Sequence, residues 1–260
     1  MISDAMLTQE YFDTMNSLDG DLAGKRSARA YMDQSSAIVH HRVVGASFIP
    51  RLYNDEVWER FRFISETIHT ILCKVIERYR NDESYRMVFD YDPRLVELIL
   101  LPRGYDAILP FARADIFLNE DTLESAFCEL NGDGSAGLNE DREIVHSIEG
   151  SETFTRFAAH HQLESCELFK SWVSEFIAIY ETFKNKVAHP RFAICDYLDV
   201  GVVDEFRIFS EYFKQAGYEC VIADVRDLSF DGTVLRDGNG QQIDCLLYTS
   251  PSPRDRQKSR

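Results

Sequence analysis

The chain has 260 residues, of which 45% are apolar, so it is long enough for one large or two small domains and is not typical of a disordered protein. Its formal net charge of −16 repels phosphate backbones and anionic lipids, and we expect neither a nucleic-acid partner nor a membrane partner. No run of about 18 apolar residues occurs, and the first residues show no targeting pattern, which predicts a cytoplasmic protein. Six scattered cysteines without a CxxC pair predict reduced, mostly buried thiols.

The first strong pattern is that of a long amphipathic helix. Apolar residues recur at steps of three and four from Val57 to Tyr79, and Asn54 before them can cap the start of a helix. We therefore expect a helix that runs to about Arg80 and packs against a sheet or another helix.

Two stretches of alternating apolar and polar residues follow, at Phe111–Leu118 and Ser125–Asn131. The polar segment 119–124 separates them, which is typical of a β-hairpin with one buried face. After a Gly-rich turn, the pattern indicates a short helix at Asn139–Ile148 and a second long helix at about Gln162–Asn185.

Further along, the pattern changes to that of a βαβ unit. Phe192–Asp196 and Tyr218–Asp224 are short apolar strands, and the helical stretch Asp204–Gln215 between them ends near Gly217. We expect parallel strands joined by a right-handed crossover. A turn cluster at 237–240 then predicts a small hairpin.

The last sixteen residues, CLLYTSPSPRDRQKSR, differ from the rest because they are basic, rich in Ser and Pro, and aperiodic. Such a composition is typical of a disordered tail. The stretch CLLYTSPSPRD is also similar to the translated read-through of a sequencing adapter, and we interpret residues 245–260 as an artefactual tail. On that interpretation the natural protein continues past Asp244.

The βαβ unit carries no standard nucleotide-binding loop. The loop after its first strand, residues 197–201, offers only Gly201, whereas a dinucleotide fold needs several glycines there so that the backbone can approach the pyrophosphate. No GxxxxGK[ST] loop occurs in the sequence, which argues against a Walker-type ATPase.

Acidic residues gather around the same loop, and they are Asp196, Asp199, Asp204 and Glu205. Ligands of open α/β sheets bind at the carboxyl ends of the strands. These acids are therefore candidates for the lining of a cleft that takes a cationic amine, and the alternative is that they are solvated loop residues.

The hairpin carries the most informative polar residues. Alternation places Arg113, Asp115 and Phe117 on one face of the first strand, and Phe127, Glu129 and Asn131 on one face of the second. If Asp115 lies opposite Glu129, an antiparallel register also sets Arg113 opposite Asn131, and all four polar groups meet. The residues between them are an apolar set that we expect to face the core: Ala114, Ile116, Cys128 and Leu130.

Two carboxylates and an amide oxygen form a set of hard oxygen donors that suits Mg²⁺ bound partly through phosphates and water. Arg113 beside them offers a planar fork of donors for a phosphate oxygen. The Gly-Asp-Gly-Ser turn at 132–135 adds backbone N–H groups, which are weak evidence for an anion site. The alternative is a surface ion-pair cluster on a solvated sheet face.

At these residues the sequence resembles the glutathionylspermidine synthase-like family of circularly permuted ATP-grasp ligases. In that family an Arg-x-Asp on one strand and a Glu-x-Asn on the next form the phosphate and magnesium site, which matches 113–115 and 129–131 here. Residues 192–244 look like the family's pre-ATP-grasp domain. The resemblance covers most of residues 90–244, while the first fifty-odd residues match nothing in the family.

The resemblance implies an ATP- and Mg²⁺-dependent carboxylate–amine ligase that forms an amide bond through an acyl phosphate. In that scheme Asp115, Glu129 and Asn131 hold Mg²⁺, Arg113 is the catalytic residue that stabilises the transferring phosphoryl group, and Ser135 adds a donor to substrate or phosphate. The implied cofactors are ATP and Mg²⁺, and the implied substrates are a glutathione-like carboxylate and a polyamine-like amine.

The resemblance also implies the domain organisation. We expect a mixed α/β fold in which residues 1–188 hold an N-terminal helical region and the hairpin of a permuted ATP-grasp domain. Residues 189–244 would form a truncated, Rossmann-like pre-ATP-grasp domain. The family's nucleotide-clamping lysines follow that domain, so we expect this chain alone to be inactive. The competing hypothesis is a non-catalytic α/β binding or scaffold protein that retains the fold.

Overall fold

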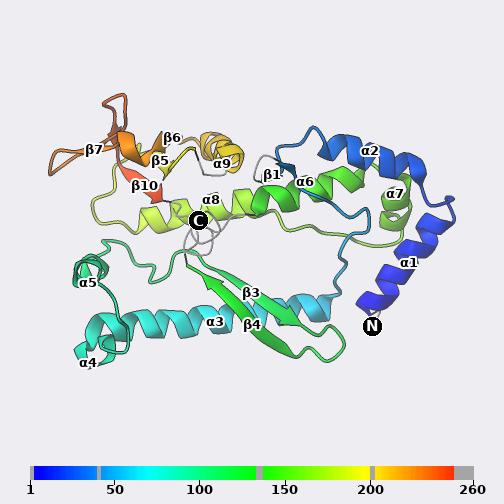
Figure 1. The fold of residues 1–260 in the computed structure, drawn as a ribbon, viewed down its shortest axis with the longest axis horizontal. Helices are drawn as coiled ribbons and strands as arrows, with labels where there is room; N and C mark the ends of the chain where they lie inside the picture. The colour runs from blue at the N-terminus through cyan, green and yellow to red at the C-terminus, as the bar shows by residue number, and fades with distance from the viewer. Residues whose placement is uncertain (1–2, 40–41, 133–136, 200–202, 249–260) are drawn as a thin grey trace.

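The computed structural model describes residues 3–39, 42–132, 137–199 and 203–248, which form a mixed α/β fold with small sheets (Figure 1). Its helices are α1 Asp4–Asn16, α2 Leu22–Met32, α3 Asp55–Asn81, α4 Glu83–Arg86, α5 Pro93–Leu100, α6 Leu138–Glu149, α7 Glu152–Ala158, α8 Leu168–Glu181 and α9 Val203–Gln215, with a 3₁₀ turn at Val225–Asp227. Its strands are β1 Ile38–Val39, β2 Arg42–Val43, β3 Arg113–Leu118, β4 Ser125–Asn131, β5 Arg191–Asp196, β6 Glu219–Asp224, β7 Ser229–Phe230, β8 Leu235–Arg236, β9 Gln242–Ile243 and β10 Cys245–Tyr248.

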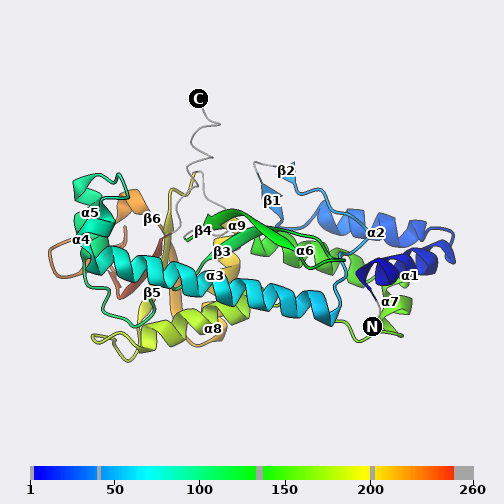
Figure 2. The ribbon, with the colours of Figure 1, turned by 90° about the horizontal axis from the view of Figure 1, so that it is seen from below.

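Helices α1, α2, α6 and α7 gather at the opposite end of the molecule from the parallel sheet (Figures 1 and 2). Tyr11 of α1 is fully buried, and its ring lies 5.3 Å from that of Phe157 on α7 in an edge-to-face contact. Burial of aromatic side chains of this size is a main source of packing energy, so α1 and α7 are held together mainly by apolar contact.

Asp21 links two helix starts in this cluster. It is the N-cap of α2, with a backbone φ of +44°, and its Oδ1 accepts a hydrogen bond of 2.8 Å from the Gly24 amide. Its Oδ2 accepts from the amide (3.0 Å) and the hydroxyl (2.7 Å) of Thr153 in the first turn of α7. Burial by itself raises the pKa of Asp21, but these hydrogen bonds outweigh it and lower that pKa below the ordinary value.

The long helix α3 confirms the amphipathic pattern. The Asn54 side chain accepts a hydrogen bond of 2.9 Å from the Val57 amide, as an N-cap residue should. In both views α3 lies along the β3–β4 hairpin (Figures 1 and 2), and Arg60 donates a hydrogen bond of 3.3 Å to the Ser125 hydroxyl at the start of β4. Of the two expected partners, a sheet or another helix, the helix thus lies along a sheet.

The βαβ unit is also confirmed. Strands β5 and β6 pair in parallel from Arg191/Glu219 to Asp196/Asp224, with α9 between them, and Gly217 ends the connection with a φ of +91°. Helices α8 and α9 cover one face of this sheet in a core that contains Phe169, Val173, Tyr180, Phe192, Ile194, Phe206, Phe209 and Phe213. Helix α8 thus shares a core with residues beyond 188, and the domain division at that residue stays a prediction.

Two expectations need correction. The helix predicted at Gln162–Asn185 begins only at Leu168, because the Glu167 carboxylate caps it by accepting hydrogen bonds from the Lys170 and Ser171 amides. The thiols are not mostly buried either, since only Cys195 is buried and all six are free.

The C-terminal tail also differs from its expected structure. Residues 245–248, at its start, form strand β10, which pairs in parallel with β5 from Cys245/Phe192 to Tyr248/Cys195. This apolar stretch, Cys-Leu-Leu-Tyr, completes the three-stranded sheet in the order β10-β5-β6. The interpretation of residues 245–260 as an artefact of sequencing is untested by this pairing and stays a prediction.

Among the described helices, none combines the length and the apolar character that a membrane span requires.

We expect Asp21→Asn to lower the free energy of unfolding by about 1.5–3 kcal/mol at pH 7, because an amide nitrogen would face donors that now bond to a carboxylate. Since the pKa of Asp21 is depressed in the fold, its contribution is present above the ordinary value of 3.8 and is lost as the pH falls. Urea unfolding at pH 7 and pH 3.5 should therefore show a large gap between variant and wild type that narrows in acid.

The matched control is Asp19→Asn, two residues away on an exposed side chain with a similar φ of +50°. An equal loss of stability in both variants would contradict the role of Asp21 as a double cap.

Candidate functional site

The predicted register of the hairpin is confirmed. Strands β3 and β4 pair in antiparallel fashion with Asp115 opposite Glu129 and Arg113 opposite Asn131. Cross-strand partners have neighbouring side chains on one face of a sheet. The four polar residues singled out from the sequence are therefore brought together at one end of the hairpin.

A β-bulge lies directly beyond this group. The register shifts between Asp115 and Ile116, so that Ile116 pairs with Phe127 and Cys128 is the extra residue of β4. The alternation along β4 is therefore interrupted at Cys128, between Phe127 and Glu129.

The expected burial of the apolar set is also wrong in part. Ala114 and Ile116 are partly buried, but Cys128 and Leu130 are exposed, Leu130 by 44%. Phe117 and Phe127 are likewise exposed, by 69% and 50%. Alternation predicts which residues share a face of a two-stranded sheet, but it does not decide which face is covered. Here α3 lies against the hairpin, and the covered face depends on that contact.

The polar group makes direct contacts. The Arg113 guanidinium donates from Nε to Asp115 Oδ1 at 2.8 Å and from Nη2 to Oδ2 at 3.4 Å. With the Asn131 amide turned so that both its atoms find partners, its nitrogen donates to Glu129 Oε1 at 3.2 Å and its oxygen accepts from Arg113 at 3.3 Å. The Arg113 and Asp115 side chains are 45% and 39% exposed, so the cluster is accessible from solvent.

The donor set fits a magnesium ion that also takes oxygens from phosphate and water. It offers the carboxylates of Asp115 and Glu129 and the amide oxygen of Asn131, all hard oxygen ligands. In the described part of the chain no group of three or more His, Cys, Asp or Glu side chains is arranged around a metal position. Two carboxylates suit Mg²⁺ bound together with a nucleotide better than an ion held by protein alone.

Ser135, the predicted donor to substrate or phosphate, lies outside the described residues, as does most of the Gly-Asp-Gly-Ser turn. Its assignment stays a prediction.

The acids around the β5 loop do not form an open cleft of free carboxylates. Asp204 pairs with Arg207 at 2.6 Å, and Asp199 pairs with Arg226 at 3.0 Å. Glu205 is only 3% exposed. Each of these three acids thus interacts with another group of the chain. The structure therefore gives no support for a cleft at this position that binds a cationic amine.

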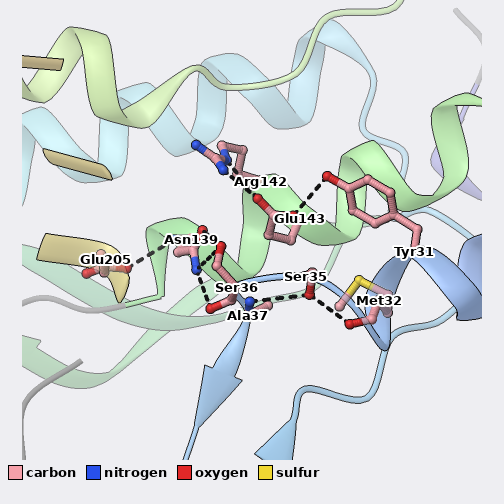
Figure 3. A network of polar contacts seen from close by, with 9 residues as sticks. All are labelled: Tyr31, Met32, Ser35, Ser36, Ala37, Asn139, Arg142, Glu143 and Glu205. Atoms are coloured by element: carbon pink, nitrogen blue, oxygen red, sulfur yellow. Dashed lines mark hydrogen bonds and ion pairs between the residues drawn. The ribbon is translucent and has the colours of Figure 1, made fainter. Parts of the chain in front are cut away.

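A network that the sequence analysis missed lies next to the hairpin exit (Figure 3). Asn139, in the first turn of α6, is 1% exposed, and its Nδ2 donates to the Ser36 carbonyl oxygen at 2.8 Å. Glu205 of α9 accepts hydrogen bonds from the amides of Gly137 at 3.3 Å and Asn139 at 3.1 Å. These partners lie 66 to 103 positions apart, and no local pattern could have revealed them.

Comparison with known proteins gives a structural likeness only. No protein-family model matches the sequence, and no curated protein matches it. Among solved structures, the chain is similar to a glutathione synthetase like-effector from Globodera pallida in its apo form, with a TM-score of 0.59 and 11% sequence identity. The alignment covers 94% of this chain and 57% of that one.

At this identity the likeness concerns the fold alone. The chain has a mixed α/β fold similar to that of a glutathione synthetase-like protein, over 57% of the length of that neighbour. This agrees with the coarser part of the expectation from the sequence, a mixed α/β fold.

The Asp115→Asn variant should keep the stability of the wild type within about 1 kcal/mol, because ion pairs between half-exposed side chains contribute little to folding. Thermal unfolding followed by circular dichroism measures this. A loss well above about 2 kcal/mol would mean that the cluster holds the hairpin together, as a structural ion-pair network does.

Proposed function

We propose that this chain carries the magnesium- and phosphate-binding part of an ATP-dependent carboxylate–amine ligase of the glutathionylspermidine synthase-like kind. The observation that carries the proposal is the meeting of Arg113, Asp115, Glu129 and Asn131 on two paired strands. The order of these residues in the sequence matches the family motif, and the fold is similar to that of a glutathione synthetase-like protein.

The proposed reaction has two steps. A carboxylate oxygen of the first substrate attacks the γ-phosphorus of ATP, the bond from that phosphorus to the bridging oxygen breaks, and ADP leaves. The amine nitrogen of the second substrate then attacks the acyl carbon, inorganic phosphate leaves with the carbon–oxygen electron pair, and the nitrogen loses a proton. Such transfers depend on positioning and charge neutralisation rather than on covalent help from side chains.

The four residues have distinct roles in this scheme. Asp115, Glu129 and Asn131 would hold Mg²⁺, which, when bound, offsets the negative charge of the phosphate oxygens. Arg113 would donate hydrogen bonds to the transferring phosphoryl group. In the ligand-free chain the Arg113 guanidinium bonds to Asp115, so the site keeps a positive charge beside its carboxylates before a nucleotide arrives.

The substrate classes rest on the family resemblance. A glutathione-like carboxylate and a polyamine-like amine are proposed on that ground. The acids near β5 add no support for the amine, because Asp199, Asp204 and Glu205 have internal partners.

The test is divalent-metal binding, because the chain spans 57% of the length of its structural neighbour and binding does not require the whole enzyme. Mn²⁺ can replace Mg²⁺ as a spectroscopic probe. We expect Mn²⁺ with ATP to bind the wild-type chain in an electron paramagnetic resonance titration. Asp115→Asn and Glu129→Gln should each weaken that binding at least about tenfold, since each removes a charged ligand.

The matched control is Glu124→Gln, which changes an exposed carboxylate in the turn of the same hairpin, directly before β4. It should bind Mn²⁺ like the wild type. Arg113→Met should bind Mn²⁺ alone as well as the wild type but lose the gain in affinity that ATP provides. Absence of specific Mn²⁺ binding, or equal affinity in all variants, would instead favour the non-catalytic binding or scaffold hypothesis.

A further inference from the structure

Helix α6 begins without a cap of its own. Its N-cap residue, Gly137, has a φ of +109° and no side chain to accept a hydrogen bond from the first turn. The first amides of a helix need acceptors. Here Glu205, from a helix 66 residues further along the chain, supplies them through its bonds to Gly137 and Asn139.

This acceptor is a buried carboxyl beside a second one. Glu205 is 3% exposed, and Glu140 in the first turn of α6 is the charged neighbour that acts on it most strongly. Glu140 Oε2 is buried without a hydrogen-bond partner in the described part of the chain. Burial, followed by the charge of Glu140, raises the pKa of Glu205 to about 6, although the α6 amides oppose this.

A further carboxyl, Asp141, lies in the same first turn of α6, and burial raises its pKa. Several other charged groups on the elements around Glu205 are engaged with partners. They are Asp204 with Arg207 on α9, Arg142 with Glu143 on α6, Glu167 with the first amides of α8, and Glu219 of β6 with Arg191. Glu140 is therefore the charged neighbour whose removal should change the pKa of Glu205 most.

The contact joins parts of the molecule that matter for the candidate site. Helix α6 follows β4, which carries Glu129 and Asn131, after a short connection. Asn139 ties the same helix start to Ser36, whose hydroxyl also lies 3.2 Å from Asn139 Oδ1 (Figure 3). The start of α6 is thereby held between α9 and the segment before β1.

We propose that Glu205 is a positioning residue, a protonatable latch that holds the start of α6 against the βαβ unit. The latch itself depends only on the described contacts. Its consequence for ligand binding rests on the proposed function of the hairpin residues.

The direction of the pH effect follows from linkage. The closed latch has a Glu205 pKa of about 6 against an ordinary 4.5, so it binds a proton about 30-fold more tightly than an open, solvated carboxyl does. The closed state is therefore favoured in acid. As the pH rises through 6, the equilibrium constant for opening the latch increases, by at most about 30-fold.

Amide hydrogen exchange tests the latch directly. Protection factors for the amides of residues 137–140, corrected for the intrinsic pH dependence of exchange, should fall about 15-fold in the wild type between pH 4.5 and pH 7.5. Glu205→Gln should abolish this pH dependence. Glu140→Gln should keep it but move its midpoint to lower pH, which a purely structural contact would not do.

The matched control is Asp204→Asn, the neighbouring carboxylate on α9, which pairs with Arg207 and should behave like the wild type. Protection that does not change with pH in the wild type would overturn the proposal, whatever the variants do. The same would hold for a midpoint that Glu140→Gln leaves unchanged.

A second readout separates the latch from the proposed function. If the hairpin binds Mn²⁺ with ATP, its affinity should depend on pH near 6 in the wild type and not in Glu205→Gln. If exchange shows the pH effect but Mn²⁺ does not bind, the latch stands and the ligase proposal fails. If Mn²⁺ binds with ATP but exchange shows no pH effect, the ligase proposal stands and the latch fails.

Discussion

The candidate site depends on the register between β3 and β4. Side chains alternate along a strand with a period of two, so a slip by one residue would send Arg113 and Asp115 to one face and Glu129 and Asn131 to the other. The observed pairing keeps all four on one face, and the bulge begins only after Asp115. The bulge thus changes the burial of the distal hairpin without separating the polar group.

Local signals predicted α3, the β3–β4 hairpin, α6, α8 and the βαβ unit, but not α1, α2, α5 or α7. The Asn54 cap, the alternation in the hairpin and the strand–helix–strand pattern ending at Gly217 all act within a few residues, and each appears in the structure. The meeting of Asp115 and Glu129 was a condition of the prediction, because alternation gives the faces of each strand while the turn fixes the register. The start of α8 was not predicted, since the cap at Glu167 lies inside a helical pattern that begins before it.

Contacts across long sequence separations could not be predicted in this way. Asp21 and Thr153 are 132 positions apart, and Glu205 and Asn139 are 66 apart. A single acidic residue in a chain of net charge −16 carries no sign that it will be buried. The exposure of Leu130 is a similar case, because it depends on which face of the hairpin is covered.

Burial separates the carboxylates of this chain into two kinds. Asp21 and Glu205 are almost inaccessible and give their oxygens to backbone amides at helix starts, where a ligand could reach them only by displacing those amides. Asp115 is paired with Arg113 but remains 39% exposed, so a metal cation could replace the guanidinium at this carboxylate without unfolding. An acidic residue that keeps a solvent-facing oxygen beside a second carboxylate is the kind suited to a metal, and the hairpin end provides that arrangement.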